Sequence, residues 1–123
     1  MLKKTVLLVE DDEDNSYLIS MMLERAGAQV QTAGTVERAL ELAVEPFDVV
    51  VSDIHLPDGN GTELLARWPA TTAKPAAVAL TGDADGDAQR RLRAAGFDLV
   101  LQKPLLPEVL IERVRELLAS SNP

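Results

Sequence analysis

The sequence predicts an α/β domain in which a parallel β-sheet carries helices on both faces. Short apolar runs alternate five times with segments of helical periodicity, which is typical of β-α-β units joined by right-handed crossovers. The run Val49–Val51 is β-branched and lies between Pro46 and the turn cluster Pro57–Gly61. Such a run indicates a strand buried on both faces, as in the middle of a parallel sheet.

Five strands are expected. The second alternates polar and apolar residues, which is typical of a short edge strand, and the others are continuous apolar runs. Their ranges are Thr5–Val9, Gln29–Gln31, Val49–Val51, Ala76–Leu80 and Leu99–Leu101.

Helices are expected between the strands. The first helix is expected to end at Gly27, and Asp12 or Asp14 is its expected N-cap. Thr35 is the expected N-cap of a helix over Val36–Val44. The common face of the first helix consists of Leu18, Met22, Leu23 and Ala26. The remaining helices are expected over Glu63–Trp68, with Trp68 as a packing residue, over Asp87–Ala95, and from Pro107 onward, with Leu110, Val114 and Leu117 on its buried face.

Composition narrows the class of protein. The 123 residues are enough for one domain with one core, and a formal charge of −8 argues against direct nucleic-acid binding. Without cysteine, the chain has neither disulfides nor a thiolate zinc site. No run approaches the ~20 apolar residues of a membrane span, and the N-terminal run is too short for a signal peptide. We therefore expect a cytoplasmic protein that does not enter a membrane.

Chemically capable residues follow four of the five strands. They are Glu10 and Asp11 after the first, Asp53 after the third, Thr81 after the fourth and Lys103 after the fifth. Because parallel strands end at one edge of a sheet, these side chains are expected to lie close together. Clustered carboxylates repel one another unless a cation shares the site, and oxygen ligands of this kind suit Mg²⁺.

The same edge has the groups that phosphoryl transfer requires. Lys103 offers a positive charge and Thr81 a hydroxyl donor, both suited to the charge on a transferring phosphoryl group. An aspartate in line with the phosphorus can accept it as an acyl phosphate. Asp53 is the acid at a central strand end, with the others around it, and is therefore the candidate acceptor.

Four motifs together resemble the response-regulator receiver domain. They are LLVEDD at 7–12, DVVVSDIHLPDGNG at 48–61, ALTG at 79–82 and LQKP at 101–104. The resemblance covers about Thr5 to Leu118, so residues 1–123 are expected to form a single receiver domain. It implies a flavodoxin-like fold with five strands in the order 2-1-3-4-5.

The resemblance also implies roles for individual residues. It assigns Asp53 as phosphoacceptor, Thr81 as switch hydroxyl and Lys103 as phosphoryl partner. The expected ligands of Mg²⁺ or Mn²⁺ are Asp11, Asp53, the backbone carbonyl of His55 and, mainly through water, Glu10. The phosphoryl donor would be a sensor histidine kinase or a histidine phosphotransfer protein. Such a domain catalyses its own phosphorylation and dephosphorylation and is not otherwise an enzyme.

Three positions bear on regulation. Receivers of the chemotaxis type usually carry Tyr or Phe three residues before the lysine, and this chain has Val100 there, so the usual threonine–aromatic relay cannot operate. His55 and Asp83 occupy positions that flank the phosphoryl group in this family, and we hypothesise that they set the lifetime of the phosphorylated state. Output is expected through a downstream protein target, with the domain a monomer or a weak phosphorylation-dependent dimer.

Alternatives remain open within the family. The segment around Val100 is more similar to receivers of hybrid sensor histidine kinases, in which the domain relays phosphate. A pseudo-receiver that acts purely as a docking module is a further possibility. Outside the family, a haloacid-dehalogenase-like phosphatase needs a second Asp two residues after the nucleophile, where this chain has His55. A P-loop enzyme needs a glycine-rich loop that the chain lacks.

Overall fold

The computed structural model describes residues 4–120, which form a sheet flanked by helices. The elements, in chain order, are β1 (Thr5–Val9), α1 (Glu13–Arg25), β2 (Gln29–Ala33), α2 (Val36–Leu42), β3 (Val49–Asp53), β4 (His55–Leu56), β5 (Gly59–Asn60), α3 (Gly61–Ala66), β6 (Ala76–Thr81), α4 (Gly86–Ala94), β7 (Leu99–Gln102) and α5 (Pro107–Ser120).

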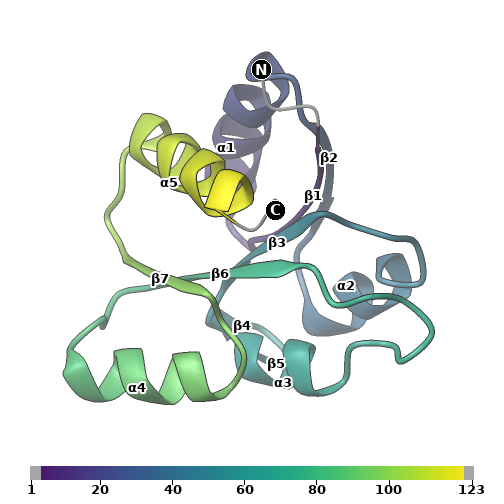
Figure 1. Cartoon of the computed structure of the whole chain (residues 1–123), viewed down its shortest axis with the longest axis vertical. Helices are drawn as coiled ribbons and strands as arrows, with labels where there is room; N and C mark the ends of the chain where they lie inside the picture. The colour runs from purple at the N-terminus through teal and green to yellow at the C-terminus, as the bar shows by residue number, and fades with distance from the viewer. Residues whose placement is uncertain (1–3, 121–123) are drawn as a thin grey trace.

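The main sheet is parallel and has the order β2-β1-β3-β6-β7. Counted over these five strands alone, this is the order 2-1-3-4-5, so the predicted flavodoxin-like fold is confirmed. Helices α1 and α5 cover one face of the sheet, and α2, α3 and α4 cover the other (Figure 1). The β-branched run in β3 lies between β1 and β6, and all five residues of this strand are buried.

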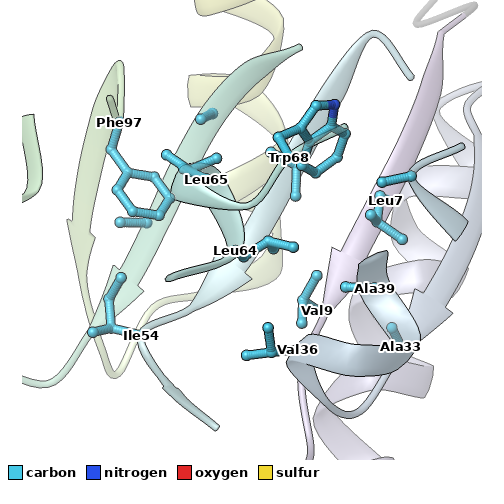
Figure 2. Close-up of a cluster of buried hydrophobic side chains, with 14 of the residues drawn as sticks. Leu7, Val9, Ala33, Val36, Ala39, Ile54, Leu64, Leu65, Trp68 and Phe97 are labelled. Carbon is cyan, nitrogen blue, oxygen red and sulfur yellow. The ribbon is translucent and has the colours of Figure 1, made fainter. Parts of the chain in front are cut away.

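Side chains alternate between two hydrophobic clusters along each strand, as the period of two in a strand requires. In β3, Val49 and Val51 face α1 and α5, whereas Val50 faces the opposite helices. Figure 2 shows the cluster that contains Val50, on the side of α2, α3 and α4, in which Leu64 and Trp68 lie near Leu7. Each fully buried Val or Leu stabilises the fold by about 1.5–3 kcal/mol, so both layers of helix are held to the sheet mainly by this apolar contact.

Local signals determine where the helices begin and end. Asp12, not Asp14, is the N-cap of α1 and accepts from the backbone N–H groups of Asp14 and Asn15. Thr35 caps α2 as predicted. After α1, Gly27 adopts φ 103°, a left-handed conformation that glycine tolerates at a helix C-terminus. Trp68 is 7% exposed and packs in the core, as expected.

Several predicted details are wrong. Leu18 is 42% exposed, and Ile19 packs on the core instead. Leu18 lies at the edge of the apolar face of α1 and lines a surface groove. On α5, by contrast, Leu110 and Val114 are buried as predicted, Leu117 packs half-buried against the same cluster, and Leu118 is a further buried residue. Helix α2 ends at Leu42, before the predicted limit at Val44, which is 61% exposed.

The segment between β3 and α3 is also more regular than a turn cluster suggests. Residues 55–60 form the two-stranded antiparallel hairpin β4–β5, in which His55 pairs with Asn60 and Leu56 with Gly59. Helix α3 then begins at Gly61, two residues before the prediction, because Asn60 supplies its N-cap. The hairpin places residues 54–60 beside the end of β3.

Within residues 4–120, no helix has the length and apolar character needed to cross a bilayer.

Candidate functional site

The carboxyl ends of β1, β3, β6 and β7 lie side by side and bring the predicted residues together. The parallel register places Asp53 opposite Leu80 and Thr81 opposite Gln102. The backbone N–H of Lys103 donates to the Thr81 carbonyl at 2.7 Å, which extends the sheet pairing by one residue. The site is therefore built on strand ends, where the sheet limits backbone movement.

Lys103 and Asp53 are in direct contact. The Lys103 Nζ donates to Asp53 Oδ2 at 2.9 Å and lies 3.8 Å from Glu10 Oε2. Burial lowers the pKa of Lys103, but the hydrogen bond and charge of Asp53, together with Glu10 and Asp11, outweigh it and hold the pKa above its ordinary value. Lys103 is thus a cation shared by the acids.

Three carboxylates form the acidic cluster predicted from the strand ends. Oxygens of Glu10, Asp11 and Asp53 lie within 4.8 Å of one another. Glu10 is almost fully buried, and burial, then the neighbouring carboxylate of Asp53, raise its pKa to about 7. Lys103 therefore does not by itself neutralise the site.

Glu10 is oriented by a residue that the sequence reasoning missed. The Asn15 side-chain amide donates from Nδ2 to Glu10 Oε1 at 3.3 Å, and the Glu10 backbone N–H donates to the Ala33 carbonyl. Asn15 lies in the first turn of α1, five residues after Glu10. The combination of a helix N-cap at Asp12 and an amide three residues later was a signal that could have indicated it.

The acidic cluster fits a hard divalent cation. Among the described residues, Glu10 Oε2 accepts no hydrogen bond although it is buried, and its nearest cation is Lys103 Nζ at 3.8 Å. A buried carboxylate oxygen without a hydrogen bond is costly. A cation held by carboxylate oxygens offsets that cost and the mutual repulsion of the acids. Receiver domains typically bind Mg²⁺, and the donor set present here is compatible with it.

His55 lies two residues beyond Asp53, in β4, with an exposed side chain. Asp83 lies in the loop after β6 and is also exposed. The structure therefore brings both residues to the same edge as Asp53. The roles of the His55 carbonyl as a ligand and of the His55 and Asp83 side chains in hydrolysis remain predictions.

The hydroxyl of Thr81 is engaged with the following loop. Its Oγ1 donates to the Asp83 carbonyl and accepts from the Asp83 N–H, both at 3.2 Å. A Cβ added at the neighbouring Gly82 would meet no atom within 4 Å. For Thr81 to donate to a group on Asp53, this local turn must rearrange.

Val100 is buried at the position where receivers of the chemotaxis type usually carry an aromatic residue. It pairs with Ala79, two residues before Thr81, and packs in the cluster that contains Leu92 and Phe97. No large side chain at this position therefore links the Thr81 region to the surface.

An apolar groove of about 370 Å³ opens next to the acidic cluster, between α1 and the β7–α5 loop. Leu18 and Leu105 line it together with Glu10 and Lys103. Leu106, just before α5, and Val109, in its first turn, are 65% and 42% exposed. Glu10 and Lys103 thus border an apolar surface.

The fold and the site together define a doubly wound α/β domain with three acids and a lysine at the carboxyl edge of its sheet. The family description "response regulator receiver domain" matches residues 6–115. The chain belongs to this family.

Relatives support the assignment. The chain is 37% identical over 119 residues to the virulence sensor protein BvgS of Bordetella bronchiseptica, covering 90% of this chain and 10% of that protein. It is 40% identical over 117 residues to the aerobic respiration control sensor protein ArcB of Escherichia coli, covering 90% of this chain and 15% of that protein. The chain thus spans only a small part of the curated relatives it matches.

A solved structure of similar size agrees with this. The CheY-like response regulator receiver domain protein of Methanospirillum hungatei superposes with a TM-score of 0.86 at 31% identity, covering 95% of this chain and 94% of that one. The chain is a receiver domain of two-component signalling, similar to the receivers of hybrid sensor kinases. Receiver domains interact with histidine kinases or histidine phosphotransfer proteins.

Proposed function

We propose that the domain is a phosphorylation-dependent switch that accepts a phosphoryl group on Asp53. The single observation that carries this is the 2.9 Å contact between Lys103 Nζ and Asp53 Oδ2, made beside two further carboxylates. An aspartate held by a lysine at a strand end is positioned as a nucleophile, and the lysine can stabilise the negative charge of the phosphoryl group that it accepts.

In the proposed step, a carboxylate oxygen of Asp53 attacks the phosphorus of a phosphohistidine. The new O–P bond forms as the N–P bond breaks, and the imidazole leaves with the electron pair and takes a proton from solvent water. Lys103 stabilises the charge on the phosphoryl oxygens. Glu10, Asp11, Asp53 and the carbonyl of His55 would hold Mg²⁺, which supplies further stabilisation of that charge. Catalysis is limited to the domain's own phosphorylation and dephosphorylation.

Thr81 is the proposed switch residue. After phosphorylation, its hydroxyl would leave Asp83 and donate to the phosphoryl group, which favours one of two loop conformations. Because Val100 supplies no aromatic, output would pass through the loop after β6 and the face of α4, β7 and α5. Arg90, Arg91 and Arg93 are exposed on α4 there, whereas Leu99 and Leu101 are buried beneath α5.

The proposed donor docks on the apolar groove between α1 and the β7–α5 loop. The groove leads from exposed Leu18 to Lys103, so an amphipathic helix seated there could present its phosphohistidine to Asp53. A sensor histidine kinase or a histidine phosphotransfer protein has this chemistry. We place the domain in the cytoplasm, where ATP-dependent kinases supply the phosphoryl group, and as a monomer or a weak dimer once phosphorylated.

The test is intact-mass spectrometry after incubation with acetyl phosphate, with and without Mg²⁺. The unchanged chain should gain one phosphoryl mass only with Mg²⁺, and Asp53→Asn should gain none. The matched control is Asp12→Asn, which removes an exposed acid next to the cluster but keeps a good N-cap. Phosphorylation of Asp53→Asn would contradict the proposed acceptor.

Relay within a hybrid sensor kinase is a second candidate, favoured by the similarity to BvgS and ArcB. In that case the phosphorylated domain should return its phosphoryl group to a histidine phosphotransfer domain faster than it hydrolyses. If neither acetyl phosphate nor a phosphorylated histidine phosphotransfer domain phosphorylates the chain, it is a pseudo-receiver that acts by docking, and the switch proposal is wrong.

A further inference from the structure

Helix α2 is capped twice, once from a distant part of the chain. Thr35 Oγ1 accepts from the backbone N–H of Arg38, as a local N-cap does. Asp58, more than twenty residues away, accepts from the N–H of Val36 at 2.8 Å and from that of Glu37 at 3.0 Å, one with each carboxylate oxygen. By contrast, α1, α3 and α4 are each capped by the residue directly before them.

Asp58 lies at the tip of the β4–β5 hairpin, between Leu56 and Gly59. The base of the hairpin is held elsewhere, because the Ile54 N–H donates to the Leu80 carbonyl and the Gly61 N–H to the Ile54 carbonyl, both at 3.0 Å. Leu56 packs partly against the core. The carboxylate of Asp58 therefore fixes the exposed end of a segment whose other end follows Asp53.

The electrostatics favour this tether. The hydrogen bonds from Val36 and Glu37, with a smaller contribution from the charge of Arg67, hold the pKa of Asp58 below its ordinary value. A negative charge is also favourable at the N-terminus of a helix. Arg67 in turn pairs with Glu37 at 2.9 Å, which joins the end of α3 to α2.

We propose that Asp58 is a positioning residue, whose carboxylate ties the β4–β5 hairpin to α2 and so holds the backbone around His55 in place beside the acidic cluster. The consequence for the cation rests on the proposed function. When the hairpin is tethered, the backbone that carries the His55 carbonyl is already ordered before a cation binds. Binding then does not pay the entropy of ordering this segment, so the affinity for the cation is higher.

The first measurement is amide hydrogen exchange without Mg²⁺, which requires no phosphorylation. In Asp58→Ala, exchange should accelerate about fivefold or more at residues 55–60. In Thr35→Ala, the matched control, the same helix loses its local cap but keeps the hairpin tether, so acceleration should be confined to α2. Asp58→Asn, which keeps one acceptor oxygen in place, should be intermediate.

The second measurement is the Mg²⁺ dissociation constant, followed by the amide NMR shifts of Asp11 and Asp53. It should rise about fivefold in Asp58→Ala, as a loss of preorganisation implies, and stay within about twofold of the unchanged chain in Thr35→Ala. Equal weakening in both variants would mean that Asp58 only stabilises α2, and would overturn the proposal.

The two proposals fail in different ways. If the unchanged chain binds no Mg²⁺ and gains no phosphoryl mass, the proposed function is wrong, and the exchange rates without Mg²⁺ still decide whether Asp58 holds the hairpin. Unchanged exchange at residues 55–60 in Asp58→Ala overturns the positioning role, whatever the outcome with Mg²⁺.

Discussion

The side-chain amide of Asn15 donates a hydrogen bond to the buried carboxylate of Glu10 across 3.3 Å. This bond favours the ionised form of Glu10, against the effects of burial and of Asp53. Because a cation binds the ionised form, Asn15 should favour metal binding through Glu10 without contacting the metal itself.

Asn15→Ala should therefore move the pKa of Glu10 upward from about 7 and weaken Mg²⁺ binding at pH 7 about threefold. Carboxyl ¹³C NMR of Glu10 measures the first effect and an amide-shift titration the second. Ser16→Ala, on the next residue of α1, is the control and should change neither. A Glu10 titration that is the same in both variants would contradict the role of Asn15.

The raised pKa of Glu10 predicts a pH dependence of stability. The ordinary value is 4.5 and the folded value about 7, so between these values the folded state binds more protons than the unfolded state. Stability must then fall as pH rises through this window.

Without Mg²⁺, we expect the free energy of unfolding to decrease by about 1–2 kcal/mol between pH 4.5 and pH 7 through this group. Glu10→Gln should flatten the curve, whereas Glu13→Gln, on the exposed first turn of α1, should leave it unchanged. Urea unfolding at several pH values measures it. A slope that survives in Glu10→Gln would refute the assignment.

Lys103 offsets part of the negative charge of the acidic cluster when no metal is bound. Lys103→Met keeps much of the aliphatic stem but leaves Glu10, Asp11 and Asp53 without a shared cation, so stability at pH 7 should fall by about 1–2 kcal/mol. Saturating Mg²⁺ should restore part of the loss, because it takes over the neutralisation. The exposed Lys74→Met is the control. Thermal unfolding with and without Mg²⁺ provides the comparison. An equal loss of stability under both conditions would argue against the role of Lys103 as the cation of the cluster.

His55 and Asp83 are predicted to set the lifetime of the phosphorylated state. After phosphorylation with acetyl phosphate and removal of the donor, the loss of phosphoryl mass gives the hydrolysis rate constant. We expect a change of about threefold or more in His55→Ala or Asp83→Ala, because both side chains are predicted to flank the phosphoryl group, where they would affect the attack of water. Asp87→Ala, exposed on α4, is the control. Hydrolysis at the unchanged rate in both test variants would exclude the hypothesis.

Gly61 packs against the chain at the acceptor. A Cβ there would lie 3.0 Å from the Asp53 carbonyl and 3.1 Å from Ile54 Cδ1. Gly61→Ala should therefore destabilise the fold by about 1–3 kcal/mol, while Gly82→Ala, whose Cβ would meet no atom within 4 Å, should be close to neutral. Chemical denaturation tests the pair, and equal stabilities would show that the site relaxes without cost.

Much of the fold followed from local patterns. The buried β-branched run Val49–Val51, the cap Thr35 and the helix end at Gly27 were all visible in the sequence, because strand periodicity and capping depend on neighbouring residues. The cap of α1 was narrowed only to Asp12 or Asp14, and the structure decides for Asp12. Leu18 was misassigned for the same reason. Its spacing fits the buried face of α1, but only the packing of α1 beside α5 decides which edge of that face is covered.

The candidate site was also predicted only in part from the sequence. The sequence determined which groups reach the sheet edge, namely Glu10, Asp11, Asp53, Thr81 and Lys103, because the carboxyl ends of parallel strands must meet there. It did not indicate how these groups are held. The amide of Asn15 on Glu10 and the carboxylate of Asp58 on α2 are contacts between separate elements. Such contacts depend on distances between side chains that exist only once the helices have packed on the sheet.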